Sequence, residues 1–172
     1  MRRVVVVGGP GSGKTTVADM LANRTSVEAI VLDALWWDSD WTPAGRQLLR
    51  ERLRPRLSAE RWVVEGNYLD EVGDLVWPLA DTIAWLDIPR RIAIRRAVVR
   101  SARRAVARSS LWNGNRESLA VLSPQSITRL IRRWPDYGVR IEQALHELPL
   151  ESATVVRLRS TTEIRTWLES LS

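Results

Sequence analysis

The sequence lacks cysteine and phenylalanine, holds one histidine, and has a single lysine among its 26 lysine and arginine residues. Without cysteine, disulfide bonds and thiolate metal sites are excluded, which fits a reducing compartment. No apolar stretch approaches the ~20 residues of a membrane helix, and the valine run after Arg3 is too short for a signal peptide. We therefore expect a soluble, cytoplasmic protein without membrane contact, folded as one domain over residues 1–172.

The one lysine lies in a glycine-rich motif. Lys14 completes the pattern Gly-x-x-x-x-Gly-Lys-Thr, which follows the β-branched run 4–7 and precedes a helical pattern over 15–22. A P-loop requires this strand, loop and helix, and its lysine offers the nucleotide phosphates a compact ammonium that an arginine fork replaces poorly. The motif predicts a nucleotide-binding loop whose backbone amides surround the phosphates. The loop residues are Gly8, Gly9, Pro10, Gly11, Ser12, Gly13, Lys14 and Thr15.

Strand and helix patterns alternate along the rest of the chain. We expect strands at 3–7, 28–33, 61–65, 82–87 and 153–158. We expect helices at 15–22, 44–57, 90–108, 125–134, from there to about 146, and 162–171 with Thr161 or Thr162 as the N-cap, and a mobile polar loop at 109–124. The alternation predicts an α/β three-layer sandwich with a five-stranded parallel sheet. Ligands bind such sheets at the carboxyl ends of the strands, where Asp33, Glu65 and Asp87 are expected.

Positive charge is concentrated in one part of the chain. Residues 90–140 contain 13 arginines and two acidic residues, so this part carries +11 and the remainder about −5. Arg96, Arg100, Arg103 and Arg104 share one face of the expected helix, since they are spaced at i, i+4, i+7 and i+8. Such a face binds nucleotide phosphates, binds a nucleic acid backbone, or is solvated and ion-paired.

Three further segments narrow the choice of P-loop protein. A second lysine, which GTPases use to read guanine, is absent, and large motor ATPases need a longer chain. The segments Leu32–Trp37, Trp62–Tyr68 and Thr82–Arg90, together with the glycine loop, resemble the adenylate-kinase-like small P-loop kinases. Within them, the chain is most similar, over about residues 3–140, to the topology-modulation proteins.

The resemblance implies a role for each matching residue. It implies ATP and Mg²⁺ as cofactors, with Thr15 and Glu65 at the metal, although the family often has aspartate where Glu65 stands. It implies that Asp33 accepts the proton of the attacking hydroxyl. It further implies a helical lid over about residues 100–128, whose Arg100 and Arg104 act with Lys14 on the triphosphate. Further nucleotide contacts are expected from Thr16, Arg96 and Arg159, and acceptor contacts from Asp33, Trp36, Trp37, Trp41, Asn67 and Tyr68.

The sequence thus predicts a Mg²⁺-dependent kinase that transfers a phosphoryl group from ATP to a small acceptor. The acceptor is a nucleoside, a nucleotide or an alcohol. The alternative is a nucleotide-binding regulatory protein that contacts nucleic acid through residues 90–140. We expect His146 to be structural, and Trp62, Trp85 and Trp167 to fill the core.

Overall fold

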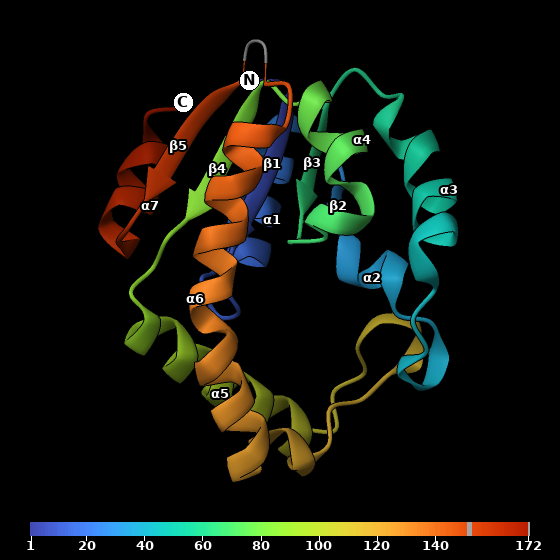
Figure 1. Cartoon of the computed structure of the whole chain (residues 1–172), viewed down its shortest axis with the longest axis vertical. Coiled ribbons are helices and arrows are strands. Elements are labelled where there is room, and N and C mark those ends of the chain that lie inside the picture. The colour runs from blue at the N-terminus through green and yellow to red at the C-terminus, as the bar shows by residue number, and fades with distance from the viewer. Residues whose placement is uncertain (151–152, 172) are drawn as a thin grey trace.

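A computed structural model describes residues 1–150 and 153–171. In it, five parallel strands form one sheet in the order β2-β3-β1-β4-β5 (Figure 1). The strands are β1 (Arg3–Gly8), β2 (Ala29–Val31), β3 (Trp62–Glu65), β4 (Thr82–Leu86) and β5 (Thr154–Leu158). Because the strand order reverses beside β1, a crevice is expected at the carboxyl end of this strand, where the glycine loop begins.

Helices cover both faces of the sheet, as Figure 1 shows for α6 in front and α1 behind. They are α1 (Lys14–Thr25), α2 (Leu32–Trp36), α3 (Gly45–Leu57), α4 (Asp74–Val76), α5 (Arg90–Val106), α6 (Pro124–Glu147) and α7 (Thr161–Glu169). Successive valines of β1 point to opposite faces, because side chains alternate along a strand. Val5 and Val7 pack with α3 and α6, whereas Val4 and Val6 pack with α1 and α7. The predicted α/β fold with a five-stranded parallel sheet is confirmed.

Three expected boundaries were wrong. Strand β2 ends at Val31, so Asp33 lies in the first turn of α2 and not at a strand end. Helix α6 runs unbroken through Pro135, where two helices were expected. The N-cap of α7 is Ser160, whose hydroxyl accepts from the amide of Glu163, so neither expected threonine has this role.

Residues 109–124 adopt defined turns where a mobile loop was expected. Two short 3-10 helices, η4 (Trp112–Gly114) and η5 (Leu119–Leu122), lie in this segment. Ser110 pairs with Arg116 in an antiparallel bridge. The segment contacts η1 (Ser39–Trp41), which follows α2. In the described ranges 1–150 and 153–171, no helix has both the length and the apolar character to cross a membrane.

Candidate nucleotide and acceptor site

The glycine loop is packed directly against two helices. A Cβ atom on Gly9 would lie 2.6 Å from the Trp134 ring of α6. A Cβ on Gly11, whose φ is +79°, would lie 2.1 Å from the Ala93 carbonyl oxygen of α5. Only glycine fits at position 11, where the close atoms are backbone, whereas a Cβ on Gly9 would displace the Trp134 ring. At its other end the loop opens α1, and the first-turn amides of a helix have no intrahelical partners and attract anions.

Lys14 is held in the loop by backbone groups. Its Nζ donates to the carbonyl oxygens of Gly8 at 2.8 Å and Gly9 at 3.3 Å. Burial lowers the pKa of Lys14, and the nearby carboxylates of Glu65 and Asp33 act in the opposite direction. In the described structure the ammonium hydrogen-bonds only to backbone carbonyls, and an arriving phosphate would place a negative charge in direct contact with it.

Asn67 fixes the entry to the loop. Its Oδ1 accepts from the Gly8 amide at 3.0 Å, and its Nδ2 donates to the Gly8 carbonyl at 2.7 Å. Both side-chain functions of Asn67 are therefore used on the loop. The expected acceptor contact of Asn67 stays a prediction, although the residue does line the cavity described below.

Thr15 and Glu65 lie side by side at the start of α1. The Thr15 hydroxyl donates to Glu65 Oε1 at 3.1 Å, and Glu65 is 3% exposed. Burial raises the pKa of Glu65, and Lys14 opposes this effect. Among the described residues, no cluster of three or more histidine, cysteine or acidic side chains would hold a metal by itself. One hydroxyl and one carboxylate suit Mg²⁺ instead, which keeps several waters and shares the substrate's phosphate oxygens.

Asp33 and Tyr68 form a pair opposite Lys14. The Tyr68 hydroxyl donates to Asp33 Oδ1 at 2.5 Å. Burial, followed by the charge of Asp33, raises the pKa of Tyr68 above its ordinary range, so the phenol keeps its proton. The ring of Tyr68 packs at 5.3 Å from that of Trp36, which fixes the phenol and, through it, the carboxylate.

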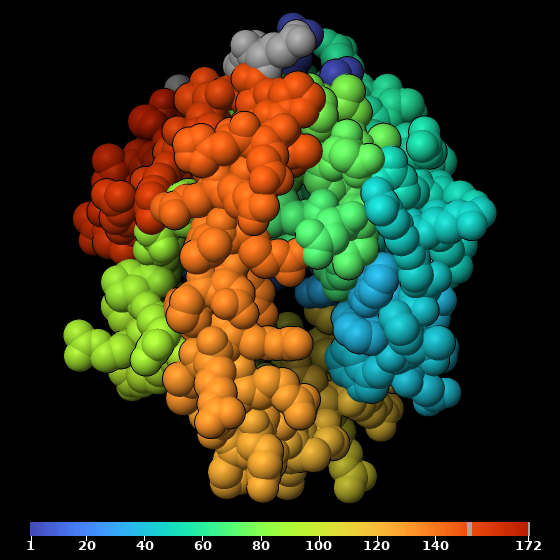
Figure 2. Space-filling model, viewed as in Figure 1, coloured from blue at the N-terminus to red at the C-terminus, as the bar shows by residue number. Residues whose placement is uncertain are grey.

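These groups line one cavity of about 630 Å³. Figure 2 shows a hollow between α6, in orange, and the blue segment that follows β2. The lining combines predicted and unpredicted residues. Predicted are Pro10, Lys14, Thr15, Asp33, Glu65, Asn67, Tyr68, Arg100 and Arg104. The sequence did not predict as site residues Gly66, Glu71, Ser110, Leu111, Trp112, Tyr137 and Arg140, although Gly66 lies in the matching segment Trp62–Tyr68 and residues 110–112 lie in the expected lid.

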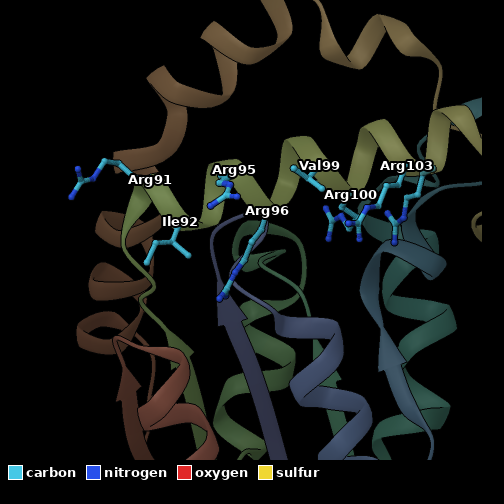
Figure 3. Close-up of a pocket in the computed structure, with 8 residues that line it drawn as sticks. Arg91, Ile92, Arg95, Arg96, Val99, Arg100 and Arg103 are labelled. Atoms are coloured by element: carbon cyan, nitrogen blue, oxygen red, sulfur yellow. The ribbon is translucent and has the colours of Figure 1, made fainter.

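Arginines of α5 extend along a groove of about 920 Å³ that leads to this cavity. Figure 3 shows Arg96, Arg100 and Arg103 pointing toward the core elements below α5, whereas Arg91 points away. Desolvation and the nearby charge of Arg104 lower the pKa of Arg100. Two guanidinium groups this close at a cavity repel each other, and a multiply charged anion would relieve this repulsion.

Arg96 and Arg159 lie on the β5 side of the glycine loop. Arg96 donates to the Thr161 hydroxyl at 2.9 Å and thereby joins α5 to the start of α7. Arg159 lies 3.8 Å from the carboxylate of Asp87, which also pairs with Arg157. Asp87 is therefore an ion-pair partner of these arginines and does not line the cavity that holds Lys14 and Asp33. Thr16 is exposed on the first turn of α1. The nucleotide contacts of Thr16, Arg96 and Arg159 stay predictions.

The three tryptophans expected at the acceptor do not line the cavity. Trp36 packs against the core beside Tyr68. Trp37 and Trp41 lie edge to face at 5.7 Å and contact the lid segment. Trp112 of the lid, which the sequence did not predict as a site residue, lines the cavity instead.

Comparisons with known proteins matched only the N-terminal part of the chain, which contains the glycine loop. Residues 4–72 match the family model described as the ATPase family associated with various cellular activities. This match covers β1 through Val72, less than half of the chain, and does not reach α5 or the lid. A comparison with curated proteins gave no match. The matched residues, the parallel sheet and the glycine loop together identify the fold as that of a P-loop NTPase.

Proposed function

We propose that this protein is an ATP- and Mg²⁺-dependent kinase of a small hydroxyl compound. The observation that carries the proposal is the single cavity shared by Lys14, Asp33 and Arg100. Phosphoryl transfer needs positioned phosphates, neutralised charge and an oriented nucleophile. An NTPase that hydrolyses only for mechanical work does not need a tyrosine-held carboxylate facing the phosphate side.

In this proposal the residues of the cavity have different roles in phosphoryl transfer. Lys14, Arg100 and Arg104 neutralise the triphosphate, while Thr15 and Glu65 hold Mg²⁺, which when bound neutralises charge on phosphate oxygens. The acceptor oxygen bonds to the γ-phosphorus, the bond from this phosphorus to the β–γ bridging oxygen breaks, and ADP leaves. The hydroxyl proton passes to Asp33. Tyr68 keeps Asp33 oriented, since its phenol donates to one carboxylate oxygen and leaves the other open.

The charges on the acceptor side of the cavity favour a substrate that has several hydrogen-bond donors and no phosphate of its own. Asp33 and Glu71 both line this side, and among the described residues the Glu71 carboxylate has no ion-pair partner. Arg140, which also lines the cavity, is already paired with Asp70. A nucleoside or polyol would donate hydrogen bonds to these carboxylates, whereas a nucleoside monophosphate would meet like charge.

The test is a panel of acceptors incubated with ATP and Mg²⁺. Pairs that differ only by a phosphate, such as each nucleoside and its monophosphate, are compared with polyols. ADP release and the mass of the phosphorylated acceptor are measured, and Asp33→Asn serves as the matched variant. We expect transfer that falls by about 10²-fold or more in Asp33→Asn. ATP affinity in the variant should stay close to that of the wild type. Absence of any phosphorylated product with every acceptor would contradict the proposal.

A second candidate function, nucleic acid binding, is favoured by one observation. Among the described residues, Arg91, Arg95 and Arg103 line the α5 groove and have no acidic ion-pair partner. If they contact a phosphate backbone, duplex DNA binding should weaken steeply with salt. The slope should fall by about one for each contacting arginine removed. The double variant Arg95→Ala, Arg103→Ala tests this. If DNA binding is weak in the wild type and does not change in the variant, only the kinase proposal remains.

A further inference from the structure

A buried asparagine joins the lid to the loop that follows α2. We use "lid hairpin" for residues 110–116 and "acceptor loop" for residues 37–43; each is closed by its own antiparallel bridge. Asn115 is 4% exposed. Its Oδ1 accepts from the Trp41 amide at 2.8 Å, and its Nδ2 donates to the Asp38 carbonyl at 2.8 Å. Both the oxygen and the nitrogen of this side chain therefore hydrogen-bond to a segment more than 70 residues earlier in the sequence.

Two further hydrogen bonds support this junction. Asn113 Nδ2 donates to the Trp37 carbonyl at 2.6 Å. The Trp41 indole Nε1 donates to the Arg116 carbonyl at 3.2 Å. Every one of these bonds runs between the lid hairpin and the acceptor loop, and in each case at least one partner is a backbone group. The junction therefore fixes backbone positions and does not merely bring side chains together.

The acceptor loop has a backbone that needs such support. Asp40 and Trp41 have φ angles of 57° and 54°, in the left-handed region. This conformation is unfavourable for residues other than glycine and persists where neighbours hold it. Because Asn115 binds the Trp41 amide, the shape of the acceptor loop depends on the position of the lid hairpin.

The same junction reaches both sides of the cavity. Two residues after Asn115, Glu117 accepts from Arg104 Nη1 at 3.2 Å, and Arg104 lines the cavity. On the other side, the acceptor loop directly follows α2, which carries Asp33. One hydrogen-bonded path therefore runs from the arginine that faces the phosphates to the helix that faces the acceptor.

We propose that Asn115 is a positioning residue that couples nucleotide binding to formation of the acceptor loop. Phosphates that engage Arg104 hold the lid hairpin closed, and Asn115 transmits this closure to residues 37–43. The end of α2, and with it Asp33, is then held in place only when the nucleotide is bound, which limits phosphoryl loss to water. The coupling rests on the proposed function only in its first step, the binding of nucleotide phosphates at α5.

Hydrogen–deuterium exchange of the full chain tests the coupling without knowledge of the acceptor. Exchange is measured with and without Mg²⁺ and a non-hydrolysable ATP analogue. In the wild type, the analogue should slow exchange in residues 8–16 and also in residues 37–43. In Asn115→Ala, slowing in 8–16 should remain, while slowing in 37–43 should fall by about 10- to 100-fold, because two hydrogen bonds are lost.

Two variants accompany Asn115→Ala. Ser118→Ala is the matched control, since Ser118 is exposed and no hydrogen bond of its side chain is found in the described structure. Asn113→Gly removes one bond of the junction and tolerates the φ of 53° found there, so it should reduce the coupling several-fold without unfolding risk.

The ratio of the exchange rates with and without the analogue distinguishes coupling from a merely structural role of Asn115 in holding residues 37–43. If Asn115→Ala raises exchange in 37–43 but the analogue still slows it by the wild-type factor, the role is only structural and the proposal fails. It also fails if the analogue protects 8–16 of the wild type and leaves 37–43 unchanged, an outcome that spares the kinase proposal. Absence of protection anywhere would overturn both.

Discussion

Replacement of Glu65 by glutamine should have opposite effects on the free and the nucleotide-bound protein. Glu65 is buried, and its carboxylate is bonded only by the Thr15 hydroxyl among the described residues. Burial raises the pKa of Glu65 despite the nearby ammonium of Lys14. The charged form therefore costs stability in the free protein. Glutamine has the same shape, keeps an oxygen for Thr15 and carries no charge.

The sign follows from linkage. A carboxyl whose pKa is raised on folding contributes stability below its unfolded pKa, and this contribution is lost as the pH rises through the folded value. At pH 8 Glu65→Gln should thus be more stable than the wild type. A buried group without full satisfaction costs about 1–3 kcal/mol, and loss of the attraction to Lys14 offsets part of the gain. A net gain of about 1 kcal/mol raises the melting temperature by about 2–4 °C at this chain length.

Thermal unfolding at pH 8 and pH 4.5 measures this gain, which should shrink at the lower pH. Titration of Mg²⁺ with an ATP analogue measures the bound state. Loss of a carboxylate near the metal should raise the Mg²⁺ concentration needed for binding by about 10–100-fold. Glu28→Gln, at an exposed position, is the control and should change neither quantity. A Glu65→Gln protein that is less stable at pH 8 and has unaltered Mg²⁺ requirement would refute the reasoning.

Three other substitutions test separate parts of the site. Lys14→Arg should abolish nucleotide binding in calorimetry while leaving the circular dichroism spectrum unchanged, since a guanidinium fork does not fit between the Gly8 and Gly9 carbonyls; retained affinity would argue against a phosphate role. Gly11→Ala should destabilise the protein by about 1–3 kcal/mol in denaturant unfolding, because its Cβ would overlap the backbone of α5; an unchanged midpoint would contradict this packing. Tyr68→Phe should lower turnover about tenfold at constant ATP affinity, because Asp33 loses its only side-chain partner among the described residues while the ring contact with Trp36 remains; equal turnover would remove Tyr68 from catalysis.

Local sequence patterns predicted the strands of the sheet, because residue type and burial within each segment determine whether it forms a strand. The valines of β1 are β-branched and buried on both faces, as parallel strands are. The end of β2 could not be predicted in this way. Val31 pairs with Glu65, and β3 ends at Glu65, so the ladder has no partner residue for Leu32. The end of β2 is thus set by a strand some 30 residues later, and Asp33 falls into a helix.

The acceptor side was harder to predict for the same reason. Asn113 and Gly114 mark a turn, and both do adopt positive φ angles. What the turn binds lies more than 70 residues earlier, and no pattern within either segment encodes that pairing. Trp36, Trp37 and Trp41 were expected at the acceptor, whereas Trp37, through its carbonyl, and Trp41, through its indole, hydrogen-bond to the lid hairpin.

The packing of the glycine loop against α5 limits which part of this helix moves. Gly11 lies so close to α5 at Ala93 and Ala97 that a Cβ atom would not fit between them, so α5 cannot move toward the glycine loop there. Arg96 lies within this fixed part and is tied to Thr161. We therefore expect closure to pivot beyond Ala97, so that Arg100 and Arg104 move with the lid hairpin while Arg96 stays in place. Exchange in residues 90–97 should accordingly be insensitive to the ATP analogue, and a large change there would show that α5 moves as a whole.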